Sequence, residues 1–172
     1  MESVDLVITG LESFTAPMAY RLGCRTTLGV LTQLFAEAER RVVISAPFMQ
    51  AGYGLSAGPL CDAVRFALAR RVSVDVISSG KSLQTICAEF AQAGSLFRSF
   101  RPQANVLDES FIGSHAKFCV GDGRAGYIGS ANLTGRGLSG QVEMGVLVRG
   151  QVAAQIEEFC DYCIETGLFL RV

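Results

Sequence analysis

The chain has 172 residues, of which 49% are hydrophobic and 18% are charged, and its formal net charge is −1. This length suffices for one domain, over residues 1–172, with a real core, and the composition excludes a disordered chain. Only Lys81 and Lys117 are lysines, which excludes the globally basic surface of a non-specific nucleic-acid binder. Four arginines are either local nucleic-acid contacts or scattered solvated residues: Arg98, Arg101, Arg124 and Arg136.

The amino terminus and the six cysteines indicate a reducing, cytoplasmic location. Glu2 and Asp5 stand where a secretory signal would be basic, and the cysteines lie mostly in apolar segments. Cys160 and Cys163 form a single C-x-x-C pair, for which buried packing is favoured over metal binding or redox chemistry. Residues 42–61 carry no charge but contain two prolines and three glycines, which favours a buried strand and loop over an integral membrane segment.

The hydrophobic pattern predicts alternating strands and helices in the first part of the chain. It predicts a strand over 4–9 and a helix over 26–40 with Thr26 in the capping position. The continuous apolar strand over 41–46 is typical of a sheet that is covered on both faces. The loop over 47–58 is long and rich in glycine and aromatic residues, and a functional loop and a plain surface loop fit it equally well.

The same alternation continues to the end of the chain. It predicts helices over 59–71, 82–93 and 151–164, and strands over 71–78, near 104–107, and over 115–120, 125–130 and 142–148. We therefore expect an α/β sandwich in which a mixed central β-sheet carries helices on both faces.

The stretch SHAKFCVGDGRAGYIGSANLTG, residues 114–135, contains the only histidine of the chain. On a strand, His115 and Lys117 point to the same face because side chains alternate with period two. The next predicted strand ends at Ser130 and Asn132, where small residues let donors approach a ligand closely. These groups suit a phosphate, since the lysine, hydroxyl and amide donate hydrogen bonds to its oxygens and a neutral imidazole can attack phosphorus.

Six residue types stand here at set offsets, in the pattern His115-x-Lys117-x4-Asp122-x6-Gly129-Ser130-x-Asn132. This pattern resembles the HKD motif of the phospholipase D superfamily, and the order of strands and helices resembles one half of a phospholipase D-like fold. The resemblance implies that His115 is the nucleophile of a phosphohistidine mechanism without metal or other cofactor. It also implies that Lys117, Ser130 and Asn132 bind the phosphate and stabilise the transition state.

The resemblance gives supporting roles to two acidic residues. It implies that Asp122 orients and buttresses the motif rather than touching substrate. Glu143, on the predicted strand 142–148, resembles the family's acidic residue that hydrogen-bonds the histidine and fixes its tautomer. An exposed glutamate on a strand is the competing interpretation of Glu143.

A phosphodiesterase of this kind needs one histidine to attack phosphorus and a second to protonate the leaving oxygen. This chain has only His115. We therefore expect a C2 homodimer whose active site forms at the twofold axis, or a partner chain that carries its own HKD motif.

The single motif resembles that of small family members, which are mostly nucleases. Residues 113–150, together with LVITG near the start, are also similar to the phospholipase D-like component of bacterial DISARM antiphage systems. These resemblances imply a nuclease that cleaves DNA in antiphage defence, delivered to its nucleic-acid substrate by other subunits of a defence complex. Two alternatives stay open: a non-catalytic subunit that binds the phosphate backbone, and a phospholipase D acting on phospholipid.

Overall fold

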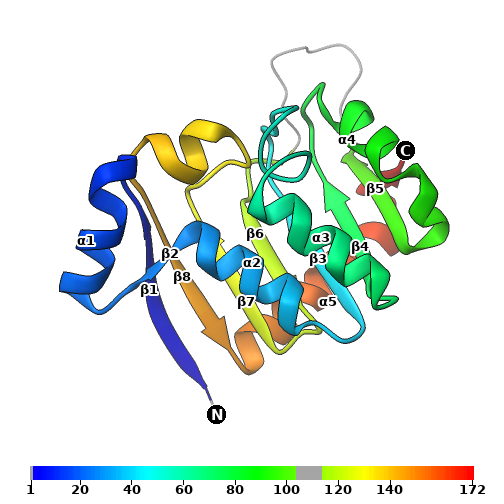
Figure 1. Ribbon diagram of the computed structural model, residues 1–172. Coiled ribbons are helices and arrows are strands. Elements are labelled where there is room, and N and C mark those ends of the chain that lie inside the picture. Colours follow the sequence, from blue (N-terminus) through cyan, green and yellow to red (C-terminus); the bar gives the residue numbers. More distant parts are fainter. Residues whose placement is uncertain (1, 104–113) are drawn as a thin grey trace.

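The computed structural model describes residues 2–103 and 114–172. Within these residues nine strands form one mixed sheet in the order β2-β1-β8-β7-β6-β3-β4-β5-β9 (Figure 1). The pairs β1–β2, β3–β4 and β4–β5 are parallel, and the other neighbours are antiparallel. The expected α/β architecture with a mixed sheet is therefore confirmed.

The strands are β1 (Ser3–Thr9), β2 (Arg25–Thr26), β3 (Arg41–Ser45), β4 (Ser73–Ile77), β5 (Phe97–Pro102), β6 (Phe118–Gly121), β7 (Ala125–Gly129), β8 (Glu143–Arg149) and β9 (Phe169–Arg171). The α-helices are α1 (Glu12–Leu22), α2 (Thr27–Glu37), α3 (Pro59–Ala69), α4 (Leu83–Glu89) and α5 (Gln151–Glu165). A 3-10 segment η1 (Ala91–Leu96) follows α4, and a π-helical turn η2 (Arg136–Gly140) precedes β8.

Most of the elements expected from the sequence are present, with ends that shift by a few residues. The expected helix over 82–93 is split into α4 and η1, and β6 begins after the lysine of the motif. The sequence pattern missed α1, β2, β5 and β9. The strand expected near 104–107 lies outside the described residues.

The core lies on both sides of β3, as its uncharged sequence predicts. Val42 and Ile44 pack into the layer of α2 and α3, whereas Val43 packs into the layer of α5. The side chain of Thr26 accepts a hydrogen bond of 3.2 Å from the backbone N–H of Gly29, which confirms its role as the cap of α2.

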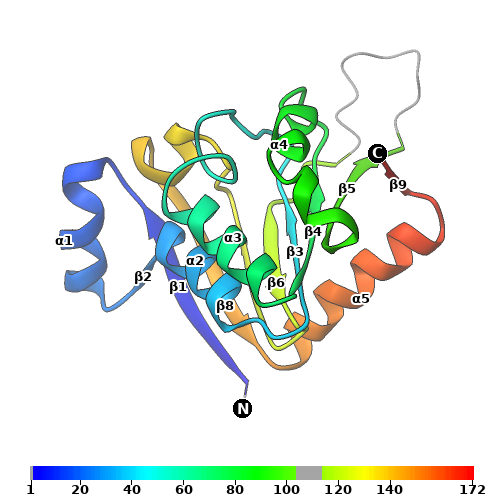
Figure 2. The same ribbon diagram turned by 45° about the vertical axis from the view of Figure 1, so that its right-hand side comes forward.

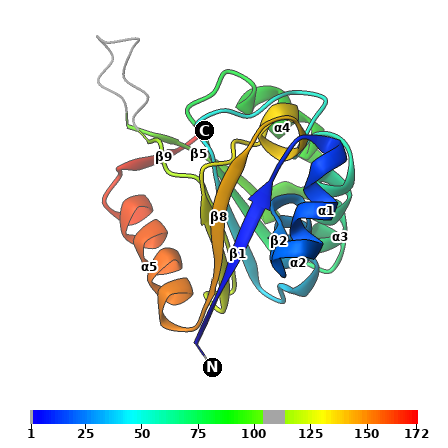
Figure 3. The same cartoon turned by 90° about the vertical axis from the view of Figure 1, so that its left-hand side faces the viewer.

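The helices are divided unequally between the two faces of the sheet. Among the described residues, helices α1 to α4 lie on one face, and α5 is the helix that crosses the other (Figures 2 and 3). A single helix cannot cover the whole sheet, so Ile128 of β7 and Met144 of β8 remain exposed on its side, next to exposed Val152 and Phe159 of α5. We call these four residues the α5-side apolar surface. Exposed apolar residues that gather on one face can form a contact with a partner.

The topology brings the ends of several strands to one edge of the sheet. Ser45, the last residue of β3, pairs with Phe118, the first of β6, and Gly129 at the end of β7 pairs with Gly145 near the start of β8. Residues 114–117 therefore lie at the same edge as the turn that follows β7. We call this edge the His115 edge.

Asp122 lies at the other end of β6, in the turn to β7. Its carboxylate accepts backbone hydrogen bonds from Glu39 (2.8 Å), Arg40 (2.9 Å) and Arg41 (2.8 Å). Burial raises the pKa of Asp122, but these three donors outweigh it, so the pKa lies below the ordinary value. Asp122 thus anchors the chain where it enters β3.

The substitution Asp122→Asn is expected to lower the free energy of unfolding by about 1–3 kcal/mol, because hydrogen bonds to a charged acceptor are lost. A carboxyl group whose pKa is lower in the folded than in the unfolded protein stabilises the fold at pH values above the unfolded pKa. This contribution is lost as the pH falls through the folded pKa. The difference from wild type should therefore be present at neutral pH and shrink below about pH 4. Urea unfolding at several pH values measures it, with Asp62→Asn at an exposed position of α3 as the control. A difference independent of pH would contradict the role of the charge.

Candidate active site

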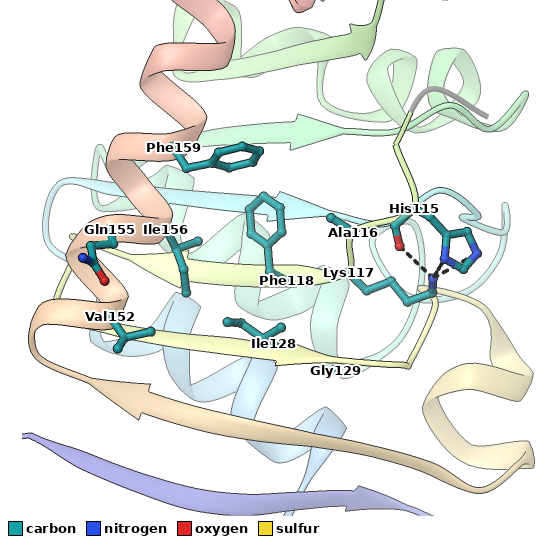
Figure 4. A pocket seen from close by; sticks show the side chains of 10 residues that line it. All are labelled: His115, Ala116, Lys117, Phe118, Ile128, Gly129, Val152, Gln155, Ile156 and Phe159. Carbon is teal, nitrogen blue, oxygen red and sulfur yellow. Dashed lines mark hydrogen bonds between the residues drawn. The ribbon is translucent and has the colours of Figure 1, made fainter. Parts of the chain in front are cut away.

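His115 and Lys117 lie side by side at the His115 edge. The Lys117 Nζ is 3.2 Å from Nδ1 and 3.4 Å from Nε2 of His115, and it donates a hydrogen bond of 3.0 Å to the His115 carbonyl oxygen (Figure 4). The carbonyl oxygen of Lys117 accepts from the N–H of Gly129 at 3.1 Å, so the pairing with β7 continues past the first residue of β6. The imidazole is exposed while the lysine is buried. The exposed ring is thereby accessible to a ligand from solvent.

Burial sets the charge behaviour of Lys117. Removal from water lowers the pKa of this lysine, and the nearby Glu143 carboxylate raises it in part, so the pKa lies below the ordinary value. Within the described part of the chain no carboxylate forms an ion pair with Lys117. A buried ammonium of this kind attracts an incoming anion, because the anion compensates the lost hydration.

Glu143 is buried, so the interpretation as an exposed strand glutamate is wrong. Its two carboxylate oxygens accept hydrogen bonds from the Ser130 hydroxyl and from the side-chain amide of Gln141. The Ser130 Oγ in turn accepts the N–H of Met144 at 3.1 Å. Neither hydrogen bond of Glu143 goes to His115 of the same chain. Sequence reasoning missed Gln141, whose glutamine side chain gives no signal of its own.

Asn132 belongs to the turn after β7, and the long loop before α3 holds it. Its Oδ1 accepts the N–H of Phe48 at 3.4 Å. Gly137 packs so closely on this turn that a Cβ there would come within 2.3 Å of the Asn132 carbonyl oxygen. A glycine at position 137 is therefore required for the turn, and neither Phe48 nor Gly137 was among the site residues expected from the sequence.

The structure thus brings together five of the expected residues, and it separates one from them. His115, Lys117, Ser130, Asn132 and Glu143 all lie at the His115 edge. Asp122 lies at the opposite edge, held by the backbone donors described above.

The four arginines considered as nucleic-acid contacts have different surroundings. Arg98 forms an ion pair of 2.6 Å with the buried Asp75, and Arg124 pairs with Glu39 at the edge opposite His115. Arg101 is only partly exposed, on β5. Arg136 begins η2, a few residues after Asn132, and is exposed. Of the four, Arg136 is the one that is exposed, forms no ion pair within the described residues and follows closely after the motif.

The cysteine pair of α5 packs in the core. Cys160 and Cys163 are both buried free thiols, which confirms the packing interpretation. Burial raises the pKa of Cys160 to about 12, so this thiol is not a ready nucleophile or metal ligand. Across the described residues, no group of three or more histidine, cysteine or acidic side chains is arranged to hold a metal ion.

A pocket of about 380 Å³ opens beside His115 on the α5 side of the sheet. Lys117 and Gly129 line its polar end, and apolar side chains of β6, β7 and α5 line the rest: Phe118, Ile128, Val152, Ile156 and Phe159 (Figure 4). The α5-side apolar surface therefore borders the histidine directly.

Three solved structures share this fold. Nuc of Salmonella typhimurium, a phospholipase D family member, aligns with a TM-score of 0.69 at 14% identity over 100% of this chain and 99% of its own. NucT of Helicobacter pylori aligns with a TM-score of 0.70 at 12% identity over 96% and 97%. Phosphatidylserine synthase of Haemophilus influenzae aligns with a TM-score of 0.72 at 16% identity, over 100% of this chain and 40% of its own. The fold is thus a phospholipase D-like fold.

The sequence comparison agrees with the fold. Residues 31–163 match the family model described as cardiolipin synthase, PLD-like domain, so the chain belongs to the family of phospholipase D-like domains. A search of the curated proteins finds no match. Membership in this family places the protein among the phospholipase D-like phosphodiesterases.

Proposed function

We propose that this protein is a metal-independent phosphodiesterase in which His115 attacks phosphorus. The contact between Lys117 and the exposed His115 ring carries this proposal, because it places a buried cation where a bound phosphate would meet the nucleophile. A ring nitrogen forms a bond to phosphorus as the ester P–O bond breaks, and a second histidine protonates the leaving oxygen. Water, deprotonated by that second histidine, then attacks the phosphohistidine and releases His115. Lys117, Ser130 and Asn132 stabilise the charge on the phosphoryl oxygens.

The second histidine comes from a second copy of the chain, in a C2 homodimer. The α5-side apolar surface supports this arrangement, because it is exposed and borders the pocket at His115. A partner on this surface would cover apolar area and bring two histidines to one site. Since the hydrogen bonds of Glu143 go to Ser130 and Gln141 and not to His115 of its own chain, the histidine that it orients in this proposal is the partner subunit's His115.

We further propose that the substrate is DNA. Nuc and NucT match this chain over nearly their whole length, whereas the chain spans 40% of the phosphatidylserine synthase, and this supports a nuclease over a lipid enzyme. A role in antiphage defence with other subunits of a defence complex, in the cytoplasm, is supported by the sequence resemblance and by the near-neutral charge.

A phospholipid substrate is the second candidate. The apolar pocket beside His115 favours it, because such a pocket suits an apolar substrate group as well as a partner subunit. In the described part of the chain, no helix has the length and apolar character to cross a membrane. Release of a lipid headgroup without cleavage of any nucleic acid would support this candidate over DNA.

Three measurements on the wild-type protein test the proposed function. The mass in solution should be that of a dimer, and DNA cleavage should persist in excess EDTA. Acid quenching during turnover should reduce the yield of the phosphorylated protein, because phosphohistidine is labile to acid, whereas alkaline quenching should preserve it. Cleavage that EDTA abolishes would contradict the mechanism, and DNA binding without cleavage would support the non-catalytic alternative.

The lowered pKa of Lys117 predicts the pH dependence of phosphate binding. As the pH rises through this pKa, the ammonium loses its proton and affinity for inorganic phosphate should weaken. The weakening should begin at a lower pH than about 10.4, the ordinary lysine value, because the pKa of Lys117 is lowered. Calorimetric titration between about pH 8.5 and 10.5, where inorganic phosphate is a dianion throughout, measures the change. In Lys117→Arg the guanidinium stays charged, and affinity should be flat over this range. Weakening in both proteins alike would show that another group titrates.

A further inference from the structure

A second concave surface lies beside the proposed active site, between the loop 47–58 and the segment that includes η2. It has a volume of about 430 Å³ and is lined by Gln50, Tyr53, Thr134, Gly135, Arg136 and Gly140. We call it the Tyr53 groove. None of these residues belongs to the HKD motif, and the mechanism above uses none of them.

Hydrogen bonds fix the Tyr53 groove relative to the Asn132 turn. The N–H of Leu133 donates to the Phe48 carbonyl at 3.2 Å, and the N–H of Gln50 donates back to the Leu133 carbonyl at 3.1 Å. The side chain of Gln50 also accepts the N–H of Gly135 at 3.1 Å. The loop 47–58 is therefore bound to the residue that follows Asn132, which keeps the groove next to the phosphate position. Such a link favours the functional interpretation of this loop.

The ring of Tyr53 lies against the backbone at Gly135 and remains half exposed. A Cβ at position 135 would come within 3.0–3.3 Å of three ring atoms, so a glycine lets the ring pack on the chain. Tyr53 keeps 52% of its surface accessible even so. A ring that packs on backbone and is still exposed offers a fixed platform for stacking.

Arg136 adds a positive charge at the same groove. It is exposed, and within residues 2–103 and 114–172 no carboxylate forms an ion pair with it. Arg98 and Arg124, in contrast, form ion pairs with Asp75 and Glu39, respectively. Arg136 is thus free to meet an anion.

We propose that the Tyr53 groove binds single-stranded DNA next to the scissile phosphate, with a base stacked on Tyr53 and a neighbouring phosphate at Arg136. An aromatic platform beside a cation is the arrangement that holds single strands, since every base presents a face for stacking. In a duplex these faces are covered by adjacent base pairs. The groove therefore selects unpaired DNA. This inference rests on the proposed phosphodiesterase function.

Binding of a fluorescent twelve-nucleotide oligo-dT to the His115→Ala protein tests the groove without cleavage. Replacing Tyr53 by alanine in this background should weaken binding about 5- to 50-fold, and replacing it by phenylalanine should preserve binding. Arg136→Ala should weaken binding, and it should reduce the slope of the logarithm of the affinity against the logarithm of the salt concentration by about one, as expected for one lost phosphate contact. The control is Tyr20→Ala near the end of α1, where the tyrosine is 92% exposed and does not line the groove. Unchanged affinity in Tyr53→Ala, or equal affinity of the parent for duplex DNA of the same length, would overturn the proposal.

Hydrolysis of bis(4-nitrophenyl) phosphate separates this proposal from the proposed function. This small diester has no DNA strand to fill the groove, so Tyr53→Ala in the otherwise wild-type chain should keep its hydrolysis within about threefold while single-strand cleavage falls at least about fivefold. If both reactions fall equally, the groove is not a strand-binding site. If the wild type hydrolyses neither substrate, the phosphodiesterase proposal fails. The oligo-dT binding measurement still tests whether the groove binds single-stranded DNA.

Discussion

Replacement of His115 by alanine is expected to lower phosphodiesterase activity on the order of 10⁴-fold or more. The large effect follows because, in the proposed mechanism, the one histidine of the chain is the nucleophile in one subunit and the acid in the other, so both functions would be lost together. The fold should be unaffected, since the imidazole is exposed and, within residues 2–103 and 114–172, its side chain has Lys117 as its hydrogen-bond partner. The measurement is the rate of diester cleavage in EDTA, with solution mass as a check that the dimer persists.

Mixed dimers make this prediction specific to a shared site. If His115→Ala subunits are exchanged at random with an equal amount of wild type, about a quarter of the dimers keep two histidines. Total activity should then fall to about a quarter of that expected for all-wild-type dimers of the same total concentration. If each subunit holds a complete site, activity falls only to about half, and the shared site is refuted.

Introduction of a charge into the α5-side apolar surface is expected to separate the subunits of the proposed homodimer. Val152 is exposed at the second position of α5, where an aspartate is favourable for the helix itself, so Val152→Asp tests the interface without a cost to folding. A lost apolar contact at a dimer centre costs about 2–4 kcal/mol, which corresponds to a dissociation constant raised about 30- to 1,000-fold. The protein should become monomeric at low concentration, and DNA cleavage should fall in proportion to the lost dimer.

The matched control lies on the other face of the sheet. Phe66 of α3 is as exposed as the residues of the α5-side apolar surface but lies among the helices of the opposite layer. Phe66→Asp should keep both the dimer and the activity. If the dimer persists in Val152→Asp and Ile128→Asp but dissociates in Phe66→Asp, the interface lies on the α3 side of the sheet and the proposed interface is contradicted.

The elements that the sequence predicted are those with an apolar pattern long enough to identify. Helix α2 buries five of its eleven residues along one face and strand β3 buries four of its five, and their patterns are correspondingly clear. Helix α1 buries no residue and contains Pro17, so its sequence carries no helical pattern to detect. Strands β2 and β9 are two and three residues long and are defined by the strands that they pair with. Pairing partners distant in sequence leave no local signal.

The sequence by itself determined the α/β class, the residue types of the HKD pattern and the presence of one histidine per chain. Only the tertiary structure decided which of these residues meet. Lys117 and Asp122 are five positions apart, which on an extended strand is roughly 15 Å, so β6 holds them at opposite edges of the sheet. Pairing of β7 with β8, in contrast, brings Ser130 and Glu143 into contact although thirteen positions separate them. Sequence spacing within a strand sets distance, whereas proximity across strands depends on the register of the sheet.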